Sequence, residues 1–76
     1  MYRAIKYHFE VGRLYRVYDF IKNQYMTSKV IYRTDKFVTV SVSGKSFTSG
    51  IYYINTPHSE ALNINGYSTI YAYDIG

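Results

Sequence analysis

The sequence predicts an all-β fold, a small antiparallel barrel or roll of about five to six strands. Three observations support this prediction. Apolar and polar residues alternate with a period of two along most of the chain, helical spacing is scarce, and turn residues recur roughly every eight to twelve positions. The chain, residues 1–76, has the length of one small β domain, and hydrophobic residues make up 47% of it, which is enough for a single core.

The first strand is predicted over residues 3–11, because apolar side chains at alternate positions share one face of an extended chain. Those side chains are Ile5, Tyr7, Phe9 and Val11, and the opposite face carries Lys6, His8 and Glu10. After a bend at Gly12, a second strand is predicted over residues 14–21. Its faces are Tyr15, Val17 and Ile21 on one side and Leu14, Arg16, Tyr18 and Phe20 on the other. Aromatic residues stand on both faces, so the sequence leaves open which face points inward.

A polar loop is predicted over residues 22–24, followed by a third strand over residues 25–33. Met26, Val30 and Tyr32 are in phase along this strand.

A short turn at residues 34–36 leads into residues 37–42, which carry the strongest strand pattern of the chain. Three valines alternate there with threonine and serine. Ser43, Gly44 and Lys45 predict a tight hairpin into a strand at residues 46–48, since glycine supplies the positive φ that such a turn requires.

The last third of the chain is predicted to hold three shorter elements. Ser49-Gly50 interrupts or bulges the preceding strand, which continues over residues 51–54 before a turn at residues 56–58. Residues 60–64 form either a strand or a single helical turn capped by Ser59. Asn65-Gly66 predicts a hairpin into a final strand over residues 67–74.

These elements predict a barrel of the Src-homology type or a similar roll. Its core is expected to include Ile5, Tyr7, Val30, Val38, Val40, Val42 and Ile54.

The sequence offers no constellation for catalysis or metal binding, so we expect neither an enzyme nor a cofactor. There is no cysteine, and His8 and His58 each have only a glutamate two residues away, Glu10 and Glu60, which we interpret as surface carboxylates. A zinc site takes roughly three or four ligands. No nucleophile elbow and no glycine-rich phosphate loop occurs.

Positive charge is concentrated in the first half of the chain. Residues 1–36 carry a net charge of +5 and residues 37–76 a net charge of −1, which gives +4 for the whole chain. A basic half favours an acidic partner, either nucleic acid or an acidic protein surface. Solvated edge-strand charges that discourage aggregation would give the same pattern.

Tyrosine and arginine define the candidate binding surface. The chain has eleven tyrosines, more than a small core can hold, so some are expected on an adhesive face. Arg16 and Tyr18 share a face of the second predicted strand, and Arg13 stands just before it. A guanidinium beside a ring suits phosphate contact with base stacking, or an acidic protein surface. Lys29 and Arg33 extend this surface across the third predicted strand, although plain β domains show similar patterns.

Several segments resemble a group of short accessory proteins from phages and mobile elements of Gram-positive bacteria. The matching segments are F-E-V-G-R-L-Y at residues 9–15, R-T-D-K-F-V-T-V at residues 33–40 and G-K at residues 44–45. Proteins of that group carry an F-E-V-G-K-T-Y opening and an R-T-x-K-x-V-T segment before a glycine-lysine turn, and Gly66-Tyr67-Ser68 with Ala72 is similar to their usual close. Many of them have paired cysteines after the opening, whereas this chain has none.

The resemblance implies an accessory gene carried by a phage or plasmid. We therefore expect a non-enzymatic protein that binds and inhibits a host defence or replication protein, with an anti-CRISPR role against an effector nuclease as the most specific version. Because the chain is basic, it would plug a site or contact an acidic patch or guide RNA rather than imitate DNA. The alternative is a small basic nucleic-acid-binding β-barrel that contacts RNA or DNA.

The expected location is the cytoplasm of the bacterial host. No stretch approaches the ~20 apolar residues that a membrane span requires, and no charged segment precedes an apolar run, so we expect no membrane contact. A domain this small, without disulfides or metal, has little stability to spare. Unpaired strand edges beside exposed tyrosines therefore favour a homodimer or docking on a partner.

Overall fold

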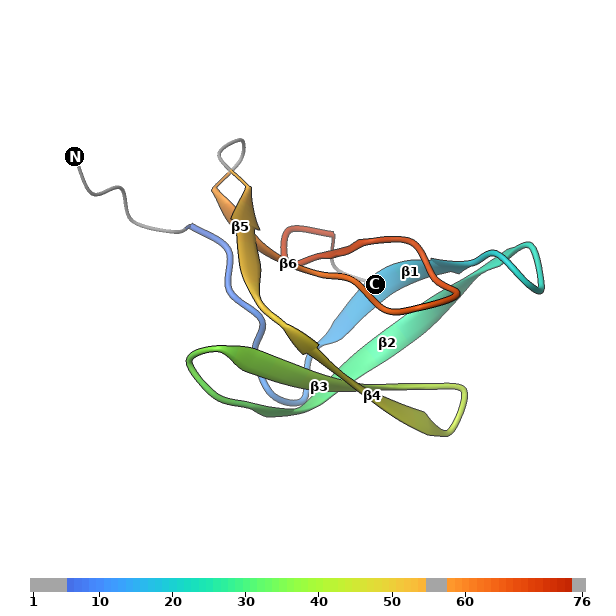
Figure 1. Ribbon diagram of the computed structural model, residues 1–76, viewed down its shortest axis with the longest axis horizontal. Coiled ribbons are helices and arrows are strands. Elements are labelled where there is room, and N and C mark those ends of the chain that lie inside the picture. Colours follow the sequence, from blue (N-terminus) through green and yellow to red (C-terminus); the bar gives the residue numbers. More distant parts are fainter. Residues whose placement is uncertain (1–5, 55–57, 75–76) are drawn as a thin grey trace.

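The computed structural model describes residues 6–54 and 58–74, and every regular element within them is a β-strand (Figure 1). The strands are β1 (Leu14–Asp19), β2 (Gln24–Arg33), β3 (Phe37–Val42), β4 (Lys45–Gly50), β5 (Tyr52–Ile54), β6 (Ser59–Leu62) and β7 (Ile70–Tyr71). They form an antiparallel four-stranded sheet in the order β1-β2-β3-β4 and a three-stranded sheet in the order β5-β6-β7. The all-β prediction is confirmed. The ladders of the described residues do not close into one barrel, so that part of the prediction is not confirmed.

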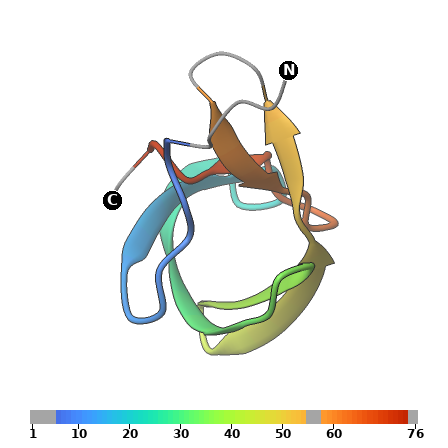
Figure 2. The same cartoon turned by 90° about the vertical axis from the view of Figure 1, so that its left-hand side faces the viewer.

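The two sheets are joined at two places and curl around a common core (Figure 2). Strand β4 passes into β5 through Ile51, whose amide donates to the carbonyl of Lys36 at 2.8 Å. At the other side, β1 bonds to the segment around β7. The amide of Arg16 donates to the carbonyl of Asp74, and the amide of Ser68 donates to the carbonyl of Tyr18, both at 2.9 Å. These bonds place the C-terminal segment along the edge of β1.

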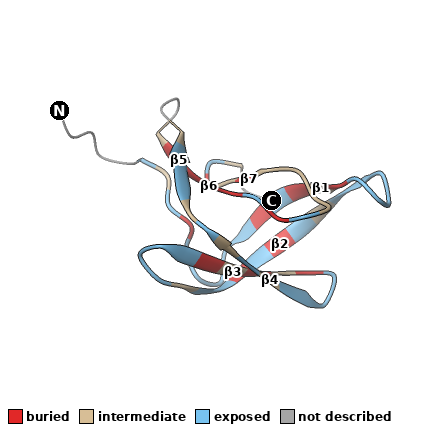
Figure 3. Ribbon diagram, in the orientation of Figure 1, coloured by how far each residue is buried: buried red, intermediate tan, exposed pale blue. Residues whose placement is uncertain are grey.

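The core lies between the inward faces of the two sheets, and buried residues alternate with exposed or half-buried ones along β1 and β3 (Figure 3). It consists of Phe9, Tyr15, Val17, Val30, Val38, Val40, Val42, Ala61, Leu62, Ile64, Ile70 and Ala72. All four predicted valines are fully buried. Tyr7 and Ile54 are only partly buried, because they lie outside the paired centre of the sheets, and Ile5 lies outside the described residues.

The strand predicted over residues 3–11 is wrong in its described part. Residues 6–11 make one isolated bridge, between Tyr7 and Ser59, and no ladder. Their amides bond to single groups instead: the amide of Phe9 donates to the Glu60 carboxylate at 2.7 Å, and that of Glu10 donates to the Tyr15 hydroxyl at 2.9 Å. Phe9 is 1% exposed and packs edge-to-face on Tyr15, but Val11, predicted on the same face, is 61% exposed because the chain turns there.

Strand β1 ends at Asp19, two residues before its predicted end, because the Asp19 side chain forms a turn. Its Oδ1 accepts from the amides of Ile21 and Lys22 at 2.9 and 3.1 Å. Asp19 therefore takes the buried position, whereas Ile21, predicted to share the face of Tyr15, is 83% exposed. The turn covers residues 20–23, and β2 already begins at Gln24.

A β-bulge in β2 reverses the faces of its last residues. Val30 pairs with Val40, but Tyr32 pairs with Thr39, so one extra residue stands between the two pairs. Beyond a bulge, inward and outward positions exchange. Tyr32, predicted to be in phase with Val30, is 62% exposed, and Arg33 points towards the core instead.

Arg33 meets a buried carboxylate, and we call this contact the Glu60 clamp. Glu60 is 1% exposed, which corrects its interpretation as a surface carboxylate. The Arg33 guanidinium donates to both its oxygens, at 2.8 and 3.1 Å, and to the carbonyl of Phe9 at 2.8 Å. His8 Nδ1 lies 3.3 Å from the second oxygen. Burial disfavours the ionised carboxylate, but the bonds from Arg33 and Phe9 outweigh it and hold the pKa of Glu60 below its ordinary value.

The last third of the chain differs from prediction in its strand lengths. The ladder runs through Gly50 and breaks at Ile51, and residues 59–62 form a strand, not a helical turn. Most of the predicted turn at 56–58 lies outside the described residues. The final strand is reduced to β7, with a separate bridge between Tyr67 and Asp19, because that segment leaves β6 to follow β1.

The hairpin between β3 and β4 tests whether the turn needs glycine for its backbone conformation. Ser43 and Gly44 both have positive φ, of 52° and 79°, as a two-residue turn of type I′ requires. A Cβ at Gly44 would meet no atom within 4 Å, so Gly44→Ala should destabilise the fold through backbone conformation alone, by about 1 kcal/mol in urea denaturation. Gly50→Ala is the control, since Gly50 has ordinary φ and room for a methyl group. Equal effects of the two changes would contradict this account.

The Glu60 clamp predicts acid-sensitive stability. Folding lowers the pKa of Glu60, so the ionised carboxylate stabilises the folded state. This stabilisation is complete above the pKa of the unfolded state and is lost as the pH falls through the pKa of the folded state. We therefore expect the free energy of unfolding to fall steadily below about pH 4.5. Glu60→Gln should cost about 3–5 kcal/mol at neutral pH and flatten this acid limb. Glu10→Gln, at the exposed carboxylate near Arg13, should change stability by less than about 0.5 kcal/mol. An unchanged acid limb in Glu60→Gln would rule out the clamp as its source.

Candidate functional site

The outward face of β1 and β2 brings together three of the five predicted binding residues. In the antiparallel register, Leu14 lies opposite Lys29, Arg16 opposite Thr27 and Tyr18 opposite Tyr25. Inward residues alternate with these, so the six side chains share the outer face of the sheet. We call them the arginine–tyrosine face. Arg16, Tyr18 and Lys29 therefore form one surface, as their spacing predicted.

The other two predicted residues are placed differently. Arg13 directly precedes β1, and its carbonyl accepts a hydrogen bond from the amide of Val30. Its guanidinium lies 3.7 Å from the Glu10 carboxylate. It is exposed near the Lys29 end of the face. Arg33 is bound within the Glu60 clamp, and Glu60 raises its pKa. The bulge that turns Arg33 inward separates it from Arg16 and Tyr18.

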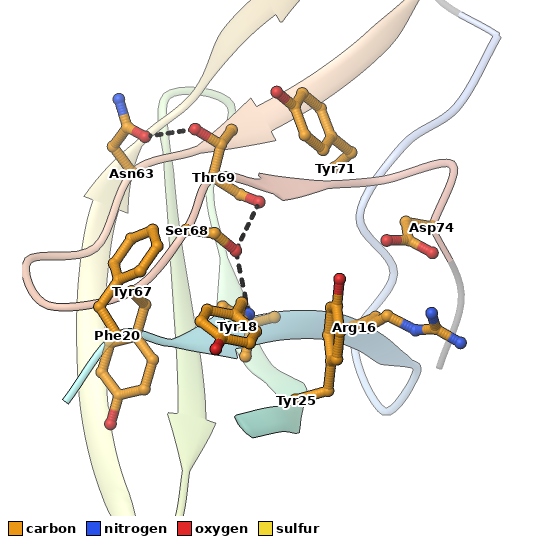
Figure 4. A pocket seen from close by; sticks show the side chains of 11 residues that line it. Arg16, Tyr18, Phe20, Tyr25, Asn63, Tyr67, Ser68, Thr69, Tyr71 and Asp74 are labelled. Carbon is orange, nitrogen blue, oxygen red and sulfur yellow. Dashed lines mark hydrogen bonds between the residues drawn. The ribbon is translucent and has the colours of Figure 1, made fainter. Parts of the chain in front are cut away.

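Two aromatic residues that were not among the five predicted binding residues complete the site. The turn after β1 and the start of β2 bring Phe20 and Tyr25 beside Tyr18 (Figure 4). Tyr18 packs edge-to-face on both, with ring centroids 5.5 Å from Phe20 and 5.0 Å from Tyr25. The Arg16 guanidinium stands over the Tyr25 ring at 5.3 Å, a cation–π contact. The alternation of residues 14–21 placed Arg16, Tyr18 and Phe20 together, but only the strand register added Tyr25.

A groove of about 520 Å³ lies between this cluster and the C-terminal segment. Its lining residues are Arg16, Val17, Tyr18, Phe20, Tyr25, Asn63, Tyr67, Ser68, Thr69, Tyr71 and Asp74. A second hollow of about 310 Å³ is lined by Arg16, Tyr25, Met26 and Thr27. Because both hollows share Arg16 and Tyr25, this stacked pair forms the ridge between them.

Hydrogen bonds fix the far wall of the groove. The Ser68 hydroxyl accepts from the amide of Tyr18 at 2.9 Å, and the Thr69 hydroxyl donates to the Asn63 side-chain oxygen at 2.8 Å (Figure 4). Tyr67 contacts Phe47 edge-to-face at 5.5 Å. The wall that carries the polar groups is therefore tied to β1 and to β4.

The arrangement provides flat aromatic rings and a cation on one surface. Within residues 6–54 and 58–74, no group of three or more histidine, cysteine or acidic side chains is placed to hold a metal ion. None of the described segments forms a helix able to cross a membrane. The groove contains one carboxylate among its described lining residues, Asp74, and no histidine to act with it as an acid–base pair.

Comparisons of this chain with protein-family models, with curated proteins and with solved structures find no match.

The groove rings are expected to contribute little to folding. Tyr25 is 67% exposed, so Tyr25→Ala should cost less than about 1 kcal/mol even though it deletes a whole ring. By contrast, Tyr15 is fully buried, and its hydroxyl accepts from the Glu10 amide and donates to the His8 carbonyl. Tyr15→Phe should therefore cost about 1–2 kcal/mol by removing a single oxygen. Thermal denaturation of both variants tests the contrast, and a larger loss in Tyr25→Ala would assign the groove a structural role.

Proposed function

We propose that this protein acts by binding nucleic acid without chemical change to it, and that the arginine–tyrosine face with its groove is the contact surface. The observation that carries the proposal is that Arg16 and Lys29 share one face with Tyr18 and Tyr25. Cations that contact phosphates and rings that stack on bases are the two elements of sequence-tolerant nucleic-acid binding. The net charge of +4 adds long-range attraction.

The proposal includes a fold that approaches a small barrel, since β1 bonds to the C-terminal segment and β4 passes directly into β5. Small barrels serve many functions, so the fold does not by itself favour one. The groove is concave, and a concave surface can receive an extended ligand such as a nucleic acid strand. A protein that blocks a partner's site would instead need a protruding surface.

A second candidate function is inhibition of a host defence or replication protein, including an effector nuclease. It is favoured by exposed rings away from the groove, at Phe37, Tyr52 and Tyr53, which a nucleic acid in the groove would leave uncovered. Tyrosine and arginine are also the residues that most often dominate protein interfaces.

Nucleic-acid binding of this kind predicts steep salt dependence and opposite effects of two charge changes. The affinity for a labelled oligonucleotide should fall steeply between about 50 and 200 mM salt, because counterion release drives phosphate contacts. Arg16→Glu combined with Tyr18→Ala should weaken binding at least about tenfold. Asp74→Asn removes a groove carboxylate and should strengthen binding. Affinity that is insensitive to salt, or weakened by Asp74→Asn, would contradict the proposal.

Affinity purification of the tagged protein from a Gram-positive lysate, with and without nuclease, separates the two candidate functions. Loss of bound material after nuclease treatment is expected for nucleic-acid binding. A protein partner that survives nuclease treatment and is released by Tyr53→Ala, but not by Arg16→Glu, would favour the second candidate.

A further inference from the structure

One face of the Tyr25 ring carries the Arg16 guanidinium, 5.3 Å from the ring centroid, and the rings at the mouth of the groove leave other flat surfaces open. Tyr18 makes interplanar angles of 64° with Phe20 and 75° with Tyr25. In an edge-to-face pair, the ring that contributes its edge keeps both faces outside that contact. Phe20 and Tyr25 are also 59% and 67% exposed. The cluster therefore offers aromatic faces on which a further planar group can stack.

The groove has the size and the chemistry for such a group. Its volume of about 520 Å³ lies within the roughly 300–1,000 Å³ of sites that enclose small organic ligands. Tyr67 and Tyr71 border its far side, so rings stand on both walls. Asp74 also lines it, and a carboxylate repels phosphate. The interior therefore suits a planar, uncharged base better than the backbone that carries it.

The cations lie where that backbone would run. Arg16 stands on the ridge of the groove above Tyr25, and Lys29 lies two residues along β2 from Thr27, the partner of Arg16. Two residues of a strand span about 7 Å. The phosphates of a nucleic acid strand with one base in the groove would thus lie over Arg16 and then near Lys29.

We infer that the groove is a subsite for an unpaired nucleobase, so that the protein prefers single-stranded nucleic acid to duplex. Bases inside a duplex are stacked on one another and cannot present their faces to Tyr18, Phe20 and Tyr25. The inference rests on the proposed function and specifies its ligand class.

Fluorescence anisotropy with matched probes tests it. The probes are a labelled deoxythymidine strand, a uridine strand of equal length, a DNA duplex and an abasic strand that keeps the phosphates but lacks the bases. The intact single strands should bind at least about fivefold more tightly than the abasic strand, which is the lower range for a stacking contact. Tyr25→Ala should remove that difference. Tyr32→Ala, at a similarly exposed tyrosine of β2 outside the groove, should retain it.

The outcomes separate the inference from the function on which it rests. Equal affinity for the abasic strand, the duplex and the single strands would mean binding by charge alone, which overturns the base subsite and leaves nucleic-acid binding intact. No binding to any probe, with a protein partner retained from lysate after nuclease treatment, would overturn both. Tighter binding of the deoxythymidine strand or of the uridine strand than of the abasic strand supports the inference.

Discussion

The fold depends on one buried ion pair, the Glu60 clamp. A carboxylate that is 1% exposed is costly unless each oxygen is bonded, and here Arg33 and the amide of Phe9 provide those bonds. The pair joins β2, β6 and the segment at residues 6–11, which has no ladder to hold it. The pair thereby holds Phe9 in edge-to-face contact with Tyr15, where Phe9 covers one end of the core. The bulge in β2 is what makes this contact available, because it turns Arg33 inward.

The clamp and the groove divide the polar groups of the molecule between stability and binding. Arg33 is bound within the protein and Asp19 is buried in its turn, so neither contributes charge to the outer face. Within residues 6–54 and 58–74, the Arg16 guanidinium stacks on Tyr25 and forms no ion pair, which leaves its donors available to a ligand. The arginine–tyrosine face is therefore a moderately charged aromatic surface. Under the proposed function, its rings would contribute to affinity beside its phosphate contacts.

The tyrosines divide in the same way because the domain is small. Tyr15 is fully buried and bonded through its hydroxyl, whereas Tyr25, Tyr32 and Tyr53 are more than half exposed. Only those rings that the curved sheet brings to one place form a site. Tyr18 and Tyr25 meet because they are direct partners across the β1–β2 ladder, while Tyr32 lies beyond the bulge and outside the groove.

The sequence by itself determined the all-β class, the valine core of β3, the hairpin at Ser43 and Gly44, and the shared face of Arg16 and Tyr18. All of these are local, since period-two alternation and positive φ act between neighbouring residues. Tertiary structure decided the rest. A bulge, invisible in an alternating pattern, sent Arg33 inward; the burial of Glu60 depends on partners 27 and 51 residues away. The groove needs strands β1 and β2 to meet the C-terminal segment, and no local pattern encodes that contact.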